Sequence, residues 1–203
     1  MAVVRSFYEK VNSYDSDDDF DPYHGICAGK IIADILECHM VKMKTANLYL
    51  SEKNLQSVSR NVKIRIFQKE CEEEIESLKS EKVSNANVSF YDILTKDINQ
   101  LAMYAGNGSI VQILRSDDYK VKFPLYASMI NSNFRKGEKR KQLLEQGNKI
   151  FHFLFKNFPQ LPHDCIEKIF SYLSDGDLRI LIEGCKPITV SSPSTDINSV
   201  VIS

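Results

Sequence analysis

Hydrophobic residues recur at three- and four-residue steps along most of the chain. Over residues 26–44 and again over 52–80, this spacing places the apolar side chains on one face of a helix and leaves charged residues on the other. We therefore predict two long amphipathic helices over these ranges, the second of them uninterrupted. Their apolar positions are Ile31, Ile32, Ile35, Leu36, Met40 and Met43 in the first, and Leu55, Val58, Val62, Ile66, Cys71, Ile75 and Leu78 in the second.

Capping signals predict shorter helices further along the chain. Ser89 is followed three residues later by Asp92, an arrangement in which the serine oxygen accepts a free backbone N–H of the first helical turn. We expect a short helix through Leu94, a second one capped by Asp97 and ended by Gly106, and a third around residues 110–114.

Proline and glycine divide the rest of the chain. Pro124 suits the first turn of a helix that we expect Gly137 to end, and a longer helix follows over 138–157. Only the weak stretch 120–124 alternates like a strand, so the predicted fold class is all-α, an irregular helical domain. Two further helices are predicted over 162–173 and 175–183, the second capped by Ser174 or Asp175, and the Ser- and Thr-rich tail from Lys186 is expected to be disordered.

Composition adds few functional constraints. The 203 residues contain 26 Lys and Arg against 27 Asp and Glu, a net charge of −1, so no global charge attracts nucleic acid or an anionic membrane. No apolar run approaches the ~20 residues of a membrane-spanning helix, and we expect a soluble intracellular protein. The cysteines are odd in number and form no Cys-x-x-Cys pair, which favours free thiols at Cys27, Cys38, Cys71, Cys165 and Cys185.

The spacing of the potential ligands in the sequence argues against a metal site. Asp15, Asp17 and Asp19 occupy the first, third and fifth positions of an EF-hand loop, but Phe20 stands where glycine is needed and Ile26 where a bidentate glutamate is needed. A solvated acidic loop is the favoured interpretation. Zinc ligation by Cys27, Cys38 and His39 is likewise disfavoured, because the eleven-residue gap lacks the paired short spacings of zinc sites.

Enzymatic chemistry is not indicated either. No cysteine or serine stands in a local nucleophile motif with histidine and a carboxylate, and the glycine-rich stretch 106–109 has no Walker lysine. The basic run 135–141 is interpreted as a solvated face, with a nuclear signal or a phosphate-binding patch as the alternative. We predict a protein that is not an enzyme and needs no cofactor or metal.

Residues 161–178 form the most specific segment of the sequence. Pro162 presets a helical turn, Ile166, Ile169 and Leu173 belong to a broad apolar stripe, and a second short helix follows with Leu178. Leu-Pro, an apolar residue four positions on, Ile-Phe-x-Tyr-Leu and Asp-Leu occur in this order, and together they resemble the start of an F-box.

Earlier segments extend the resemblance. With residues 88–94, 101–104, 123–126, Arg140 and 143–144, the F-box-like end resembles the PRANC domain, the carboxy-terminal module of poxvirus ankyrin-repeat proteins, over about 52–184. Residues 101–114 also resemble the middle of one ankyrin repeat, but no ~33-residue recurrence accompanies them. The chain therefore looks like a separately encoded carboxy-terminal module without the repeats that capture a target in that family.

The resemblance implies partners and a binding face. In that family the F-box-like end binds the adaptor subunit of a host cullin-RING ubiquitin ligase, so the expected partners are this adaptor, the cullin scaffold and an unknown host target, with no nucleic acid and no membrane. The alternatives are an inhibitor that masks a host innate-signalling protein without a ligase, and a degenerate fragment of a longer ankyrin protein. The implied protein-binding residues are Leu161, Pro162, Ile166, Ile169, Leu173 and Leu178.

The same reasoning gives a domain organisation. We expect an acidic flexible amino-terminal segment over 1–25, a helical PRANC-like domain over 26–160, F-box-like helices over 161–184 and a disordered tail over 185–203. The F-box-like function, as a substrate adaptor or a decoy, implies the host-cell cytoplasm, with the nucleus as the alternative.

Overall fold

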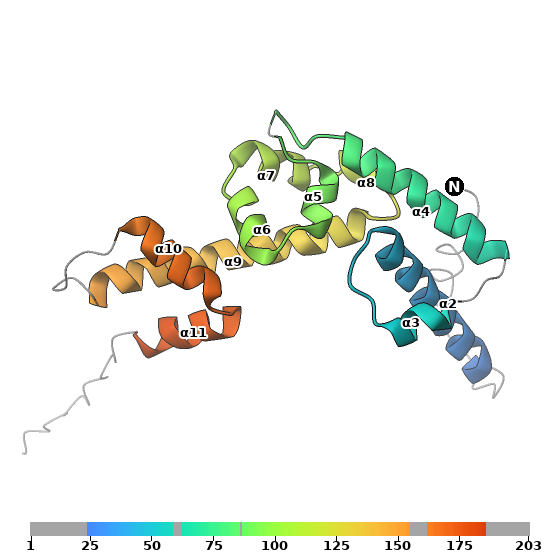
Figure 1. Cartoon of the computed structure of the whole chain (residues 1–203), viewed down its shortest axis with the longest axis horizontal. Coiled ribbons are helices and arrows are strands. Elements are labelled where there is room, and N and C mark those ends of the chain that lie inside the picture. Colours follow the sequence, from blue (N-terminus) through green and yellow to red (C-terminus); the bar gives the residue numbers. More distant parts are fainter. Residues whose placement is uncertain (1–23, 59–61, 86, 155–161, 186–203) are drawn as a thin grey trace, which may run out of the picture. The chain divides into compact units, whose positions relative to one another are not determined.

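The computed structural model describes residues 24–58, 62–85, 87–154 and 162–185, and the fold of this part is all-α, as predicted (Figure 1). The predicted segment 1–25, apart from its last two residues, and the tail from Lys186 lie outside the described residues. The chain divides into two compact units, unit 1 (Met1–Lys141) and unit 2 (Gln142–Ser203), and the division falls inside one long helix. The helices are α2 (His24–Thr45), α3 (Glu52–Ser57), α4 (Val62–Ser80), α5 (Phe90–Thr95), α6 (Ile98–Tyr104), α7 (Gly108–Arg115), α8 (Asp118–Lys122), α9 (Ala127–Leu154), α10 (His163–Tyr172) and α11 (Asp175–Gly184).

In unit 1, α2 and α4 pack side by side and run in the same direction (Figure 1). The Tyr126 hydroxyl donates to the Lys42 carbonyl oxygen over 3.0 Å, while the Tyr126 N–H donates to the Glu74 carboxylate over 2.9 Å. These bonds place Lys42 of α2 level with Glu74 of α4. Near the carboxyl ends, the Tyr91 hydroxyl donates to the Ala46 carbonyl oxygen, and the Lys79 ammonium lies over the Tyr91 ring.

The region predicted as one helix over 52–80 contains two, so that prediction is wrong. α3 ends at Ser57, and Val58 is extended, with φ −68° and ψ 119°. The local sequence explains the interruption, because serine, valine and asparagine at 57–61 all have weaker helix propensities than the Glu- and Lys-rich sequence that follows in α4.

The predicted caps of α5 and α6 are confirmed. Ser89 and Asp92 form a reciprocal capping box, in which the Asp92 N–H donates to the Ser89 hydroxyl oxygen over 3.1 Å and the Ser89 N–H donates to the Asp92 carboxylate over 2.7 Å. Asp97 caps α6 by accepting from the N–H groups of Asn99 and Gln100. α7 has a comparable cap from Asn107.

The stretch that alternates weakly over 120–124 is not a strand. It belongs to α8 and the turn after it, and Tyr119 and Phe123 are both buried four residues apart, as on one helical face. Their rings pack on Phe90, with centroids 5.9 and 5.0 Å away. Pro124 lies in the turn before α9 rather than in its first helical turn.

The prediction that Gly137 ends a helix is also wrong, because α9 continues through it to Leu154. Gly137 is buried in unit 1 against α6. A Cβ atom at Gly137 would stand 2.7 Å from the Leu101 carbonyl oxygen and 2.8 Å from the Leu101 Cβ. Glycine therefore allows α6 to approach the backbone of α9 closely, and this packing outweighs its poor helix propensity of about 1 kcal/mol relative to alanine.

Candidate functional site

Helix α10 of unit 2 has two apolar faces, and the inner one holds it in place. Ile166 and Phe170 on this face are buried, together with Leu178 of α11. The Phe170 ring meets the Phe151 ring edge-on, with centroids 5.9 Å apart. Gly147 of α9 lies beneath the pair, since a Cβ there would come within 3.3 Å of the Phe170 ring and 3.6 Å of a Leu178 methyl. α10 and α11 thus share one small core with the last turns of α9.

The outer face of α10 remains open to solvent. Cys165, Ile169 and Tyr172 follow each other at four- and three-residue steps, and all three are exposed, Ile169 by 44% and Tyr172 by 76%. We call these three residues the outer stripe. The Lys168 ammonium lies 5.2 Å from the Tyr172 ring centroid. Exposed apolar side chains that adjoin one another in this way are typical of partner surfaces.

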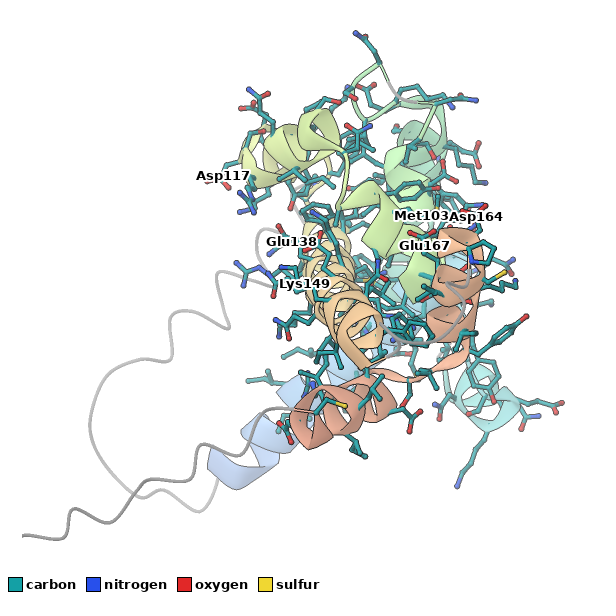
Figure 2. The ribbon with its side chains drawn as sticks, turned by 90° about the vertical axis from the view of Figure 1, so that its left-hand side faces the viewer. Met103, Asp117, Glu138, Lys149, Asp164 and Glu167 are labelled. Carbon is teal, nitrogen blue, oxygen red and sulfur yellow. The ribbon has the colours of Figure 1, made fainter. Side chains whose placement is uncertain are left out.

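Charged side chains occupy other exposed positions of α10. Asp164 and Glu167 on α10 are both exposed, and Figure 2 labels them. On α11, Ile180 is 72% exposed. An apolar stripe on a helix whose other exposed positions are charged has the composition of an interface core with a polar surround.

A capping box fixes the turn between the two helices. Ser174, one of the two residues predicted for this role, caps α11: the Asp177 N–H donates to its hydroxyl oxygen over 3.2 Å, and the Ser174 N–H donates to the Asp177 carboxylate over 3.0 Å. The Ser174 hydroxyl also donates to this carboxylate, and these hydrogen bonds lower the pKa of Asp177. The turn is therefore defined by local sequence.

Of the six predicted binding residues, the structure describes five, and these differ in burial. Leu161 is outside the described residues, and Pro162 is exposed as the N-cap of α10. Ile169 lies in the outer stripe, Leu173 is partly buried, and Ile166 and Leu178 belong to the inner core. Their role in binding a partner stays a prediction. Tyr172 and Ile180, which the prediction omits, are the more exposed apolar residues of this unit, and the three-residue step from Ile169 was the signal for Tyr172.

The basic run 135–141 is divided by burial within unit 1. Arg140 is only 1% exposed and donates from Nε to the Asn99 side-chain oxygen over 3.0 Å, while Glu138 pairs with Arg115 over 2.8 Å. Arg135, Lys136 and Lys139 are exposed. A nuclear signal read along the extended chain would need Arg140 to leave the core, so the structure favours the solvated-face interpretation for the other members of the run.

The remaining candidates do not assemble into a chemical site in the described part of the chain. Cys38 is half-buried and His39 exposed, no group of three potential metal ligands lies together there, and the acidic loop 15–21 is not described. Cys38, Cys71, Cys165 and Cys185 are free, and burial raises the pKa of the Cys71 thiol to about 12. None of the described helices is both long and apolar enough to cross a bilayer.

Comparison with known families connects this geometry to one domain. Residues 85–183 match the PRANC domain family, and this stretch begins just before α5 and ends in α11. The carboxy-terminal part of the chain is therefore similar to the PRANC domain. The chain is also similar to an ankyrin repeat protein of fowlpox virus (strain NVSL), with 24% identity over 133 residues, which cover 64% of this chain and 25% of the relative.

The matches cover only part of this chain and a small part of the fowlpox virus relative. The chain spans about a quarter of the length of the fowlpox virus relative that it matches. No solved structure is significantly similar to it. The predicted resemblance to the PRANC module of poxvirus ankyrin-repeat proteins is confirmed, and the matched stretch 85–183 contains both the inner core and the outer stripe of α10.

Proposed function

We propose that this protein is a non-enzymatic host-interaction protein, and that its α10–α11 end binds the adaptor subunit of a host cullin-RING ubiquitin ligase. The supporting observation is the outer stripe of α10, an exposed apolar surface within the PRANC domain and within the segment that resembles an F-box. A protein with this partner acts in the host-cell cytoplasm as a substrate adaptor or as a decoy.

The predicted binding residues would have two roles, depending on whether they are exposed or buried. Pro162 and Ile169 are exposed, so they are available to contact the adaptor, and Tyr172 extends the same face. Ile166 and Leu178 hold the helix pair on α9 and act on binding through the shape of this pair. Large apolar and aromatic side chains at the centre of an interface contribute most of its binding energy, which favours Ile169 and Tyr172 as anchors.

Affinity purification from animal cells tests the proposal. The tagged full-length chain is compared with the variant Ile169→Asp/Tyr172→Asp and with Met103→Asp, a matched control at a residue of α6 that is 74% exposed. The wild type and the control should co-purify the adaptor and the cullin, and the double variant should lose both, since two carboxylates would be buried at the interface centre.

The opposite result identifies the alternative. A wild type that retains neither adaptor nor cullin would remove the ligase from the proposal and leave the masking of a host innate-signalling protein. If the adaptor is bound, a change in the ubiquitination of a captured host protein, present with the wild type and absent with the double variant, distinguishes a substrate adaptor from a decoy.

A further inference from the structure

Two tyrosines in the described part of the chain are largely exposed, and one of them belongs to the outer stripe. Tyr172 is 76% exposed and Tyr49 is 89% exposed, whereas Tyr119 and Tyr126 are buried in the core of unit 1. The hydroxyl group of Tyr172 is therefore accessible to a modifying enzyme, at a position where the proposed function needs an apolar surface.

The backbone on the carboxyl side of Tyr172 is already extended. Tyr172 is the last residue of α10, and Leu173 follows with φ −80° and ψ 138° and Ser174 with φ −70° and ψ 165°. The ends of helices also open locally at a lower free energy than helices inside a core. An enzyme cleft that binds an extended segment can therefore engage residues 172–174 after little local opening.

The two serine hydroxyls of this segment are engaged in hydrogen bonds. The Ser171 hydroxyl donates to the Lys168 carbonyl oxygen over 2.7 Å, and the Ser174 hydroxyl donates to the Asp177 carboxylate over 2.7 Å. A kinase that modified either serine would have to break these bonds first. The Tyr172 side chain lies mostly in solvent, so it is the most accessible phosphate acceptor of the segment.

A lysine lies close enough to pair with a phosphate group on Tyr172. The Lys168 ammonium is 5.2 Å from the centroid of the Tyr172 ring, and Lys168 is itself exposed. A phosphate on a side chain carries about −1.5 to −2 charges at neutral pH and pairs with nearby cations. Phosphorylation would thus replace the apolar end of the outer stripe, next to Ile169, with a hydrated ion pair.

We propose that Tyr172 is a phosphorylation site for an ATP-dependent protein tyrosine kinase, and that this modification prevents the outer stripe from binding the adaptor. The Tyr172 Oη forms a bond to the γ-phosphorus of ATP, and the bond from this phosphorus to the β-phosphate oxygen breaks. ADP leaves with the electron pair of that bond, and the phenol proton passes to a base of the kinase. Burial of the resulting dianion in an apolar interface is unfavourable. The effect on the adaptor rests on the function proposed for α10.

Phosphorylation of the purified full-length chain tests the site. The chain is incubated with a recombinant tyrosine kinase domain, ATP and Mg²⁺, and tryptic peptides are quantified by mass spectrometry. Peptide 169–179 should gain one phosphoryl group in the wild type and none in Tyr172→Phe, while the buried Tyr119 and Tyr126 stay unmodified. Tyr49, in peptide 45–53, reports whether the kinase accepts exposed tyrosines of this chain. An unmodified Tyr172 in a chain whose Tyr49 is modified would overturn the proposal.

Calorimetric titration of the adaptor into the unmodified and the phosphorylated chain tests the regulation. The phosphorylated wild type should bind on the order of thirtyfold more weakly, the factor that corresponds to about 2 kcal/mol at a central interface residue, and phosphatase treatment should restore binding. Kinase treatment should not change the affinity of Tyr172→Phe, which controls for phosphate on Tyr49.

The two parts of the proposal fail in different ways. Equal affinities of the unmodified and phosphorylated wild type would overturn the regulation and leave the adaptor as the partner of α10. A wild type that binds no adaptor even before phosphorylation would refute the function proposed for α10. The peptide measurement would then decide by itself whether Tyr172 is a phosphorylation site.

Discussion

The short helices of units 1 and 2 are buried in different ways. In unit 1, the core draws on helices from α2 to the first half of α9, and buried polar groups tie distant segments together. Glu74 accepts from the N–H groups of Leu125 and Tyr126, and Arg140 donates to Asn99. In unit 2, α10 and α11 share one small core with the end of α9.

This difference in burial explains why one side of α10 is available to bind a partner. Ile166 and Phe170 of α10 are buried in the core of unit 2, whereas Ile169 and Tyr172 of the outer stripe stay exposed. Two short helices cannot bury two apolar sides against a single supporting helix. The structural role and the binding role of α10 are therefore assigned to different residues of the same short helix.

The largest expected effect is in the core of unit 1. Phe134 is 2% exposed on α9, and Phe134→Ala should lower the free energy of unfolding by about 3–5 kcal/mol, because it leaves a large cavity in a close-packed core. Chemical denaturation followed by circular dichroism measures this change. Val121→Ala at an exposed site should alter stability by less than about 0.5 kcal/mol. Equal effects of the two substitutions would contradict the extent of this core.

A smaller loss is expected at the polar anchor of unit 1. Glu74→Leu leaves the N–H groups of Leu125 and Tyr126 without an acceptor and should cost about 2–3 kcal/mol, whereas Glu74→Gln keeps an acceptor oxygen and should cost less than about 1 kcal/mol. Urea denaturation of the two variants is the measurement. If Gln and Leu were equally destabilising, the charge rather than the hydrogen bonds would hold the turn before α9.

The same carboxylate predicts a pH dependence. Burial raises the pKa of Glu74 above its usual range, although hydrogen bonds from Tyr126 and Leu125 oppose this shift. The folded state then binds the proton more tightly than the unfolded state, so the contribution of Glu74 to stability is full below the unfolded pKa and is lost as pH rises through the folded pKa. Glu74→Gln should abolish this part of the pH profile, and an unchanged profile would refute the assignment.

Alanine substitutions at the two glycines of α9 allow a direct comparison of the packing in the two units. Gly137→Ala should destabilise unit 1 by about 1–2 kcal/mol, because the new Cβ meets the Leu101 backbone, which cannot move aside. Gly147→Ala in unit 2 meets only the Phe170 and Leu178 side chains and should be tolerated better. Thermal unfolding of both variants tests this order, with Gly108→Ala, which meets no atom within 4 Å, as the control.

The smallest expected effect lies at the α11 cap. Ser174→Ala removes the hydroxyl that accepts from the Asp177 N–H and should destabilise α11 by about 1 kcal/mol. Hydrogen exchange should show faster opening of α11 while the amides of α4 and α5 are unchanged. Faster exchange throughout both units would instead indicate that they unfold as one.

Local signals account for what the sequence could predict. The caps at Ser89, Asp97 and Ser174 are formed by residues two or three positions apart, so the sequence contains all the information that they need. The passage of α9 through Gly137 depends on Leu101, and the burial of Arg140 accompanies its bond to Asn99, contacts between residues about 40 positions apart that no local pattern reveals. The apolar stripe of α10 was predictable, whereas its division into inner and outer sides required the packing on α9.

The most direct measurement of the central claim is a calorimetric titration of the purified ligase adaptor subunit into three purified proteins, with the melting temperature of each recorded. The wild type should bind, Ile169→Asp/Tyr172→Asp should lose binding with an unchanged melting temperature, and Ile166→Ala should lower the stability of unit 2 by about 2–4 kcal/mol. A double variant that binds as well as the wild type, or a wild type that does not bind, would contradict the assignment of the outer side of α10 to the adaptor.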